Sequence, residues 1–375
     1  MNIVINTSNL NSGGALQVAY SVIHEFTIIG SKHNFLILTS PQVYDQISSI
    51  KFKNNFELKL INQSPASIKT RSKIVNKLDK HVEEFKGNTV LTIFGPSYWI
   101  PKVYHVSGFA DGWCYNPKSI AYSQLDFIKK IKRKLLSKYK LFHLKRSSNY
   151  IFVETEDAKS KLTSILNNSN IPISVISNTY SHIYDEVKEL KILTSHKVES
   201  NGNSNFLLLS TNNPNKNIKI LNKILPILKE KIPLINFFVT ISNEDYKNII
   251  TIDNMEYVTN LKSLSVTECI EAYKNVDFLF LPTLLETFTA TYPEAMIMKK
   301  PILTSDLSFA RDICGDAAIY FDPLNPEDIC IKIIDLVHNK SKIDELIRLG
   351  EIRVKNFPSA NDRAKEILKL CIINK

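Results

Sequence analysis

The stretch 276–305 places the strongest constraint on the fold. It starts with an apolar run from Asp277 to Leu281, passes through a polar loop, predicts a helix at about 292–298, and ends with a second apolar run at 302–304. Two short apolar runs joined through a helix are typical of a right-handed crossover unit, whose strands lie parallel in one sheet. We therefore expect parallel α/β structure.

Two glutamates stand on either side of the polar loop. Glu286 follows the first strand, where open α/β sheets bind their ligands, and Glu294 lies in the first turn of the helix. The N–H groups and partial positive charge at a helix start suit a phosphate, so one hypothesis is a nucleotide-sugar site. A capping box, with Thr291 as N-cap and Glu294 three residues later, explains Glu294 without a ligand. The residues alone leave both interpretations open.

Strands and helices alternate along both halves of the chain. A length of 375 residues and a hydrophobic content of 44% suit two domains with separate cores. The first half opens with a strand at 2–6, the glycine pair Gly13 and Gly14, and an amphipathic helix. Further strands are predicted at 35–40, 90–95, 102–110, 150–155, 206–210, 235–241 and 255–261. The polar segment 195–205 is interpreted as a loop near the boundary between the domains.

The run PTLLETFTATYPEAM, with the KKPILTSDLSFARDICGDAAIYFDPLNPEDI that follows it, resembles the donor-site region of the retaining family-4 glycosyltransferases, the "group 1" domain of the GT-B fold. The resemblance covers nearly the whole chain and is strongest at 206–330. It implies two Rossmann-like domains with parallel sheets facing a central cleft, an acceptor-side domain at 1–180 and a donor domain at 181–354. The C-terminal helix, 355–375, is expected to return to the first domain.

The same resemblance implies a role for the acidic motif and its loop. Glu286 would contact the transferred sugar and Glu294 the ribose hydroxyls. The backbone amides between them would face the sugar and the phosphates, and they belong to Thr287, Phe288, Thr289 and Ala290. The family often has glycine where Thr287 and Thr289 stand, so the amide geometry or the space for the sugar is expected to differ here.

Further site residues are also implied by the resemblance. Lys216, in the run TNNPNKN, matches the lysine that neutralises the donor diphosphate, whereas Ser210 or Thr211 occupies the position of the family's arginine. The turn of Asn260, Leu261 and Lys262 matches the loop that holds the nucleobase. Gly13 and Gly14 match a loop at the cleft, although a tight turn without a ligand explains them equally well.

Asp111 follows the strand at 102–110, at the place where family members often carry an acceptor-side His or Asp. It is therefore the catalytic candidate in the first half. His105 lies within that strand, and we interpret it as a core or surface residue rather than a catalyst. Asp306 is interpreted as a helix cap.

The net charge of +10 is concentrated in one segment. Nine of the eighteen residues at 129–146 are Lys or Arg and none is acidic, so the remainder carries only +1. Apolar residues recur at helical spacing, at Ile128, Ile131, Leu135, Tyr139 and Phe142. This stripe could pack on the domain and the helix could approach an anionic membrane surface, and the two interpretations are compatible. No recognised nucleic-acid motif accompanies the charge, so no nucleic-acid partner is expected.

Other features limit the class of protein. No apolar run is long enough to span a membrane and the N-terminus does not resemble a signal peptide, so a cytoplasmic protein is expected, on or off the inner face of the membrane. The five cysteines are scattered, which argues against disulfides or zinc, and we interpret them as buried apolar residues. No Asp-x-Asp motif occurs, so neither a metal nor a cofactor is expected.

The expected reaction is transfer of a hexose from a nucleotide diphosphate sugar to a hydroxyl of a glycan or lipid-linked acceptor, with retention of configuration. The resemblance favours bacterial surface-polysaccharide synthesis. Two alternatives stay open: a nucleotide-sugar epimerase of GT-B fold, and a non-catalytic, degenerate glycosyltransferase subunit. A phosphorylase is disfavoured because no pyridoxal phosphate lysine site is recognisable.

Overall fold

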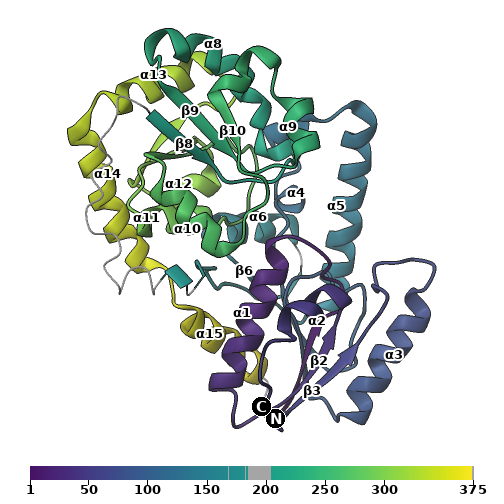
Figure 1. Ribbon diagram of the computed structural model, residues 1–375. Coiled ribbons are helices and arrows are strands. Elements are labelled where there is room, and N and C mark those ends of the chain that lie inside the picture. Colours follow the sequence, from purple (N-terminus) through teal and green to yellow (C-terminus); the bar gives the residue numbers. More distant parts are fainter. Residues whose placement is uncertain (168, 182, 185–203, 374–375) are drawn as a thin grey trace. The chain divides into compact units, whose positions relative to one another are not determined.

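The computed structural model describes residues 1–167, 169–181, 183–184 and 204–373. Most of the loop predicted at 195–205 lies outside these ranges. The chain divides into two compact units (Figure 1). Unit 1 comprises 1–117, 131–178 and 358–375, and unit 2 comprises 118–130 and 179–357. The expected division near residue 180 did not assign 118–130 to the second unit.

Unit 1 is built on a seven-stranded, all-parallel sheet in the order β3-β2-β1-β4-β5-β6-β7. Its central strands are buried along their length, as expected for a parallel sheet covered on both faces by helices. The strands are β1 (Asn2–Thr7), β2 (Asn34–Thr39), β3 (Phe56–Leu60), β4 (Thr89–Thr92), β5 (Tyr104–Gly108), β6 (Tyr150–Val153) and β7 (Ile173–Val175).

The helices of unit 1 connect these strands, and the last of them arrives from the C-terminus. They are α1 (Gly14–Ile29), α2 (Pro41–Ile47), α3 (Arg71–Glu84), α4 (Gly112–Tyr115), α6 (Glu156–Ile165) and α15 (Ala360–Ile372). The helix α5 (Phe127–Ser147) begins in the segment assigned to unit 2 and continues into unit 1. No helix among the described residues is both long and apolar enough to cross a bilayer.

Helix α15 packs on α1 and on the sheet of unit 1. Ile367 is 1% exposed within the same apolar cluster as the α1 and β1 residues. The Thr89 hydroxyl donates to the Cys371 carbonyl at 2.9 Å, and the Arg363 guanidinium donates to Ser21 Oγ at 2.8 Å and to Asn178 Oδ1. The C-terminal helix is therefore a structural part of unit 1.

Unit 2 has a six-stranded, all-parallel sheet in the order β10-β9-β8-β11-β12-β13. Its strands are β8 (Ser204–Leu208), β9 (Ile235–Val239), β10 (Val258–Asn260), β11 (Phe278–Leu281), β12 (Ile302–Ser305) and β13 (Ala318–Phe321). From residue 204 onward its α-helices are α8 (Leu221–Lys231), α9 (Asn243–Ile249), α10 (Val266–Lys274), α11 (Thr291–Ile297), α12 (Ser308–Cys314), α13 (Pro326–Val337) and α14 (Lys340–Arg353).

The 3₁₀ helices in the described part of the chain are short. They are η1 (Ile120–Gln124), η2 (Pro214–Lys216), η3 (Ile218–Ile220), η4 (Ile252–Tyr257) and η5 (Val354–Asn356). The segment η3 leads directly into α8, which tolerates Pro226 within it.

Both sheets reverse their strand order at their first strand. In unit 1, β1 lies between β2 and β4, and in unit 2, β8 lies between β9 and β11. In open α/β sheets, ligands bind beyond the carboxyl ends of the strands at such a reversal. The loops after β1, β8 and β11 are therefore the positions from which a site would be built.

Two expectations about single residues need correction. Four of the cysteines are buried as expected, but Cys269 is only partly buried. Asp306 does not cap a helix, because α12 starts after Leu307, and its carboxylate instead accepts from Arg311 Nε at 2.5 Å and from Nη2 at 2.8 Å.

Candidate functional site

The short helix η2 is fastened to the loop that follows β11. The Asn215 side chain donates from Nδ2 to the Leu285 carbonyl at 2.8 Å, and the Leu284 N–H donates to the Asn215 carbonyl at 2.7 Å. Asn217 ends η2 in the left-handed conformation, with φ of 54°, and donates to the Pro323 carbonyl at 2.9 Å. These bonds fix the direction in which Lys216 leaves the backbone.

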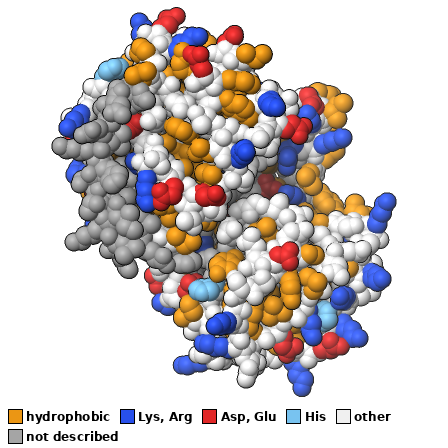
Figure 2. All heavy atoms as spheres, in the orientation of Figure 1, with side chains coloured by type: hydrophobic (Ala, Val, Ile, Leu, Met, Phe, Trp, Pro, Cys, Tyr) orange, Lys and Arg blue, Asp and Glu red, His pale blue; other side chains and the backbone are white. Residues whose placement is uncertain are grey.

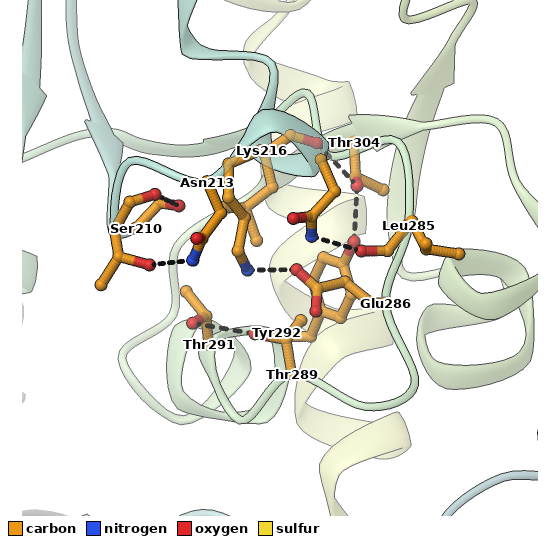
Figure 3. Close-up of polar contacts among 12 residues, drawn as sticks. Ser210, Asn213, Lys216, Leu285, Glu286, Thr289, Thr291, Tyr292 and Thr304 are labelled. Carbon is orange, nitrogen blue, oxygen red and sulfur yellow. Dashed lines mark hydrogen bonds and ion pairs between the residues drawn. The ribbon is translucent and has the colours of Figure 1, made fainter. Parts of the chain in front are cut away.

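Lys216 and Glu286 meet at the strand reversal of unit 2. The Lys216 ammonium donates to Glu286 Oε1, and the two side chains point toward each other in Figure 3. Their side chains are 19% and 15% exposed, so the pair is partly shielded from water. Two residues that the sequence separates by 70 positions thus form one charged pair beyond β8 and β11.

Glu294 lies one turn into α11, and the capping-box interpretation of it is wrong. The N-cap is Ala290, whose carbonyl accepts from the Glu294 N–H at 3.0 Å, and Thr291 is the first helical residue. Burial of the Glu294 carboxyl raises its pKa to about 7, an effect that the neighbouring Tyr184 hydroxyl partly offsets. The carboxyl therefore has a structural neighbour in Tyr184 but does not cap the helix.

The loop between the two glutamates has one buried anchor. Phe288 is 9% exposed and its ring packs edge-on against Phe357, with centroids 5.9 Å apart. Thr289 donates to the Thr291 hydroxyl at 3.2 Å, while Thr287 and Ala290 are partly buried. The Phe288 side chain thus faces the core, and only the backbone of this residue is available to a ligand.

Helix α11 is also held in place by hydrogen bonds to the sheet. The Tyr292 and Thr304 hydroxyls lie 2.7 Å apart, and Thr304 donates to the Leu281 carbonyl at 3.0 Å (Figure 3). These bonds tie α11 to β12 and to the last residue of β11. The position of Glu294 relative to the end of β11 is therefore set by buried contacts.

Ser210 and Thr211 lie in the loop after β8, from which only Leu209 separates them. The Ser210 N–H donates to Thr240 Oγ1 at 2.9 Å, and the Thr211 hydroxyl accepts from Asn213 Nδ2 at 2.9 Å. Both residues carry small polar groups at the position for which the resemblance implies an arginine. Lys216 therefore provides a positive charge in this part of the site.

The turn expected to hold a base follows β10. Asn260 Oδ1 accepts from the Lys262 N–H at 3.1 Å and from the Ile241 N–H at 3.3 Å, and Lys262 has a φ of 62°. Leu261 is partly buried. The Asn260 side chain thus shapes the turn, which presents backbone and the exposed Lys262 side chain.

The remaining candidates belong to unit 1. Gly13 is the N-cap of α1 with φ of 73° and ψ of −165°, and a Cβ added at Gly13 or Gly14 would meet no atom within 4 Å. Asp111 is the N-cap of α4, accepts from the Trp113 N–H at 3.1 Å, and pairs with Lys140 at 2.6 Å. Its carboxylate therefore has structural partners in addition to any catalytic role.

His105, interpreted from the sequence as a core or surface residue, lies in the core. It is fully buried, with Nδ1 2.6 Å from the Ser147 carbonyl and Nε2 2.7 Å from the Thr92 hydroxyl. Burial lowers its pKa to about 4, and the hydrogen bond to Ser147 only partly opposes this. The imidazole is neutral at physiological pH and both ring nitrogens have partners.

Some residues of the site were not identified from the sequence. Asn215, Asn217 and Tyr184 position Lys216 or border Glu294. The unusual run of asparagines at 212–217 was the available signal for the first two, because asparagine is enriched at turns and left-handed positions. Within the described residues, no three His, Cys, Asp or Glu side chains are grouped closely enough to hold a metal ion.

Comparisons with known proteins agree with this architecture. Residues 204–339 match the family described as Glycosyl transferases group 1. No curated protein matches the chain. Three similar solved structures are Anabaena HepE in complex with UDP and glucose, sucrose-phosphate synthase from Thermosynechococcus elongatus, and a glycosyltransferase from Rickettsia africae.

These three likenesses extend over whole chains at low sequence identity. HepE has 11% identity and a TM-score of 0.70, with 99% of each chain covered. The synthase has 12% identity and a TM-score of 0.73, covering 99% of this chain and 98% of its own. The Rickettsia protein has 17% identity and a TM-score of 0.71, covering 100% and 99%. The fold of this protein is GT-B, with two parallel-sheet α/β units.

Proposed function

We propose that this protein is a retaining glycosyltransferase, which moves a hexose from a nucleotide diphosphate sugar to a hydroxyl of a glycan or lipid-linked acceptor. The observation that carries the proposal is the Lys216–Glu286 pair. It lies at the strand reversal of unit 2, within the residues that match Glycosyl transferases group 1.

The positive charge of Lys216 and the negative charge of Glu286 complement the charges that develop when the bond between the sugar and the diphosphate breaks. Cleavage between the sugar and the diphosphate leaves negative charge on the phosphates and positive character at the anomeric carbon. Lys216 would stabilise the first and Glu286 would orient the sugar that carries the second. Such charges act strongly where water is partly excluded, as it is around this pair.

Glu294 would accept hydrogen bonds from the ribose hydroxyls, and the backbone at 287–290 would face the sugar and phosphates. For retention, we propose that the new bond forms on the face from which the diphosphate departs. The departing phosphate takes the acceptor proton. Lys216 supplies positive charge without an Asp-x-Asp motif, so we expect transfer without a divalent metal. The setting we propose is bacterial surface-polysaccharide synthesis.

The test is release of nucleoside diphosphate from a panel of nucleotide sugars by the purified full chain. UDP-glucose is the first donor to try, because HepE is solved with it. We expect slow hydrolysis of one donor, lost in Glu286→Ala and kept in Glu230→Ala, a control at an exposed glutamate on α8. Equal loss in both variants would contradict the assignment.

Two other outcomes would favour the alternatives. Conversion of the donor sugar without an acceptor or nucleotide release would indicate an epimerase. Absence of release with every donor, also with lipid-linked acceptors, would indicate a degenerate subunit. Thr287, Thr289 and the lack of an arginine at 210–211 are the features that would explain such a loss.

A further inference from the structure

Helix α5 turns a stripe of apolar side chains toward solvent. Ile128, Ile131, Leu135 and Phe142, here called the outer stripe, are 64%, 43%, 61% and 53% exposed. Their spacing of three, four and seven residues places them on one face of the helix. Tyr139, the fifth residue of the predicted stripe, does pack on the domain, with its ring centroid 5.9 Å from that of Tyr98. The interpretation that the stripe packs on its domain is therefore wrong for the other four residues.

The opposite face of α5 holds the helix to unit 1. Leu144 is fully buried, Lys140 pairs with Asp111 at 2.6 Å, and the Arg133 guanidinium lies over the Trp113 ring at 5.0 Å. Rotating the helix to bury the outer stripe would break these contacts and expose Leu144. The outward position of the stripe is thus fixed by specific interactions on the inner face.

Basic residues border the outer stripe. At 3.6 residues per turn, Lys134, Lys138 and Lys145 follow one edge of it and Lys132 lies on the other. All four are exposed. Hydrophobic side chains lie beside Lys and Arg over α5 in Figure 2. An apolar strip with a row of lysines along one edge and a single lysine on the other matches an anionic bilayer, which offers phosphates at the surface and acyl chains beneath.

We propose that α5 docks this protein on an anionic lipid surface, with the outer stripe inserted at the level of the upper acyl chains and the bordering lysines on lipid phosphates. A second copy of the chain is a poorer occupant. Two-fold pairing would bring two segments with nine basic residues and no acidic residue against each other. The proposal does not depend on the transfer reaction.

The first experiment is co-sedimentation of the full chain with vesicles. We expect binding to vesicles of phosphatidylglycerol and phosphatidylcholine, and little binding to phosphatidylcholine alone. Ile131→Ser with Leu135→Ser should lower the partition coefficient about tenfold or more, since two inserted side chains are lost. The matched control is Ile331→Ser with Ile352→Ser, at side chains that are 62% and 51% exposed on α13 and α14.

An equal loss in the control pair, or no loss in the α5 pair, would overturn the proposal. All four positions are exposed, so we expect both double variants to fold, and unchanged thermal unfolding verifies it. A lipid-free dimer that Ile131→Ser with Leu135→Ser disperses would assign the stripe to a second copy instead. Lys134→Gln with Lys138→Gln and Lys145→Gln should weaken binding mainly at low salt.

Insertion is distinguished from surface adsorption by a fluorescent reporter. In Leu135→Trp, anionic vesicles should shift the tryptophan emission to shorter wavelength, and brominated acyl chains should quench it. Ile331→Trp serves as the control and should show neither effect beyond the background of the two native tryptophans. Binding without a shift or quenching in Leu135→Trp would overturn insertion.

Discussion

At the scale of single residues, Lys216 has Glu286 as its partner, and a donor diphosphate would compete with that carboxylate. We predict that Lys216→Ala weakens nucleoside diphosphate binding about ten- to a hundredfold, the usual effect of losing a charged hydrogen bond. Glu286→Gln should leave this affinity unchanged or raise it, while lowering sugar transfer. Calorimetric titration and donor turnover measure the two effects separately.

The test is specific because the two substitutions, Lys216→Ala and Glu286→Gln, are expected to change nucleoside diphosphate affinity differently. Lys216→Arg keeps the positive charge and should retain part of the affinity that Lys216→Ala loses. If Glu286→Gln weakened nucleoside diphosphate binding as much as Lys216→Ala does, the pair would be a structural salt bridge, whose loss distorts η2. The proposed division of roles would then be incorrect.

The raised pKa of Glu294 leads to a prediction about pH. The folded-state pKa of about 7 lies above the ordinary value of 4.5, so the folded protein holds a proton that the unfolded chain releases. Stability is therefore lost as pH rises from about 4.5 to about 7, on the order of 2–3 kcal/mol. Glu294→Gln should remove this loss, as seen in urea unfolding at pH 5 and pH 8.

The same carboxyl links pH to donor binding. Ionised Glu294 accepts hydrogen bonds from ribose hydroxyls better than the neutral acid does, so wild-type affinity for the nucleotide should rise as pH passes 7. Glu294→Gln should flatten this profile. A profile that keeps its midpoint in the variant would assign the titration to another group.

The sequence pattern alone predicted the surroundings of single residues only in part. For His105 the sequence left a core and a surface position open, and its complete burial places it in the core. The meeting of Lys216 and Glu286 depends on the pairing of β8 with β11, which no spacing in the sequence encodes. The family resemblance suggested that both belong to one site, and hydrogen bonds from Asn215 place them there.

At the scale of elements, the strands that are buried along most of their length were the ones predicted from the sequence. Continuous apolar runs such as β1 and β11 were predicted because strands covered on both faces contain few polar residues. The edge strand β3 and the three-residue β7 were not, since neither has a continuous buried run. For α5, periodicity correctly indicated a helix but could not indicate whether the apolar face points inward.

The start of α1 allows a prediction from two adjacent glycines. Gly13 has backbone angles that only glycine adopts readily, whereas Gly14 has a helical position with open space around it. Gly13→Ala should therefore destabilise the protein by about 1–3 kcal/mol. Gly14→Ala should stabilise it by roughly 0.4–1 kcal/mol, since alanine restricts the unfolded chain.

Activity separates the two explanations of this glycine pair. If the loop leaves room for a ligand, Gly14→Ala should lower sugar transfer although the protein becomes more stable. Thermal unfolding and turnover of the same sample measure both. A stable Gly14→Ala variant with full activity would favour a tight turn without a ligand.

At the scale of the whole molecule, the core is divided. Each buried apolar cluster among the described residues draws its members from one unit, and α15 contributes Ala364, Ile367 and Leu370 to a cluster of unit 1. The chain therefore completes unit 1 only when its last helix has been synthesised. The local unfolding free energy of each unit should therefore change independently, because a substitution in one core leaves the packing of the other core intact.

We predict that Ile367→Ala destabilises unit 1 by about 2–4 kcal/mol, the usual cost of a cavity at a buried isoleucine. Leu225→Ala, at a fully buried leucine of α8, is the matched change in unit 2. Hydrogen exchange of peptides from β1 and from β8 measures each unit separately. We expect Ile367→Ala to accelerate exchange in β1 alone, and Leu225→Ala in β8 alone. Equal acceleration of both strands by either variant would show that the units unfold together, because a cavity in one of two independent cores should not destabilise the other unit.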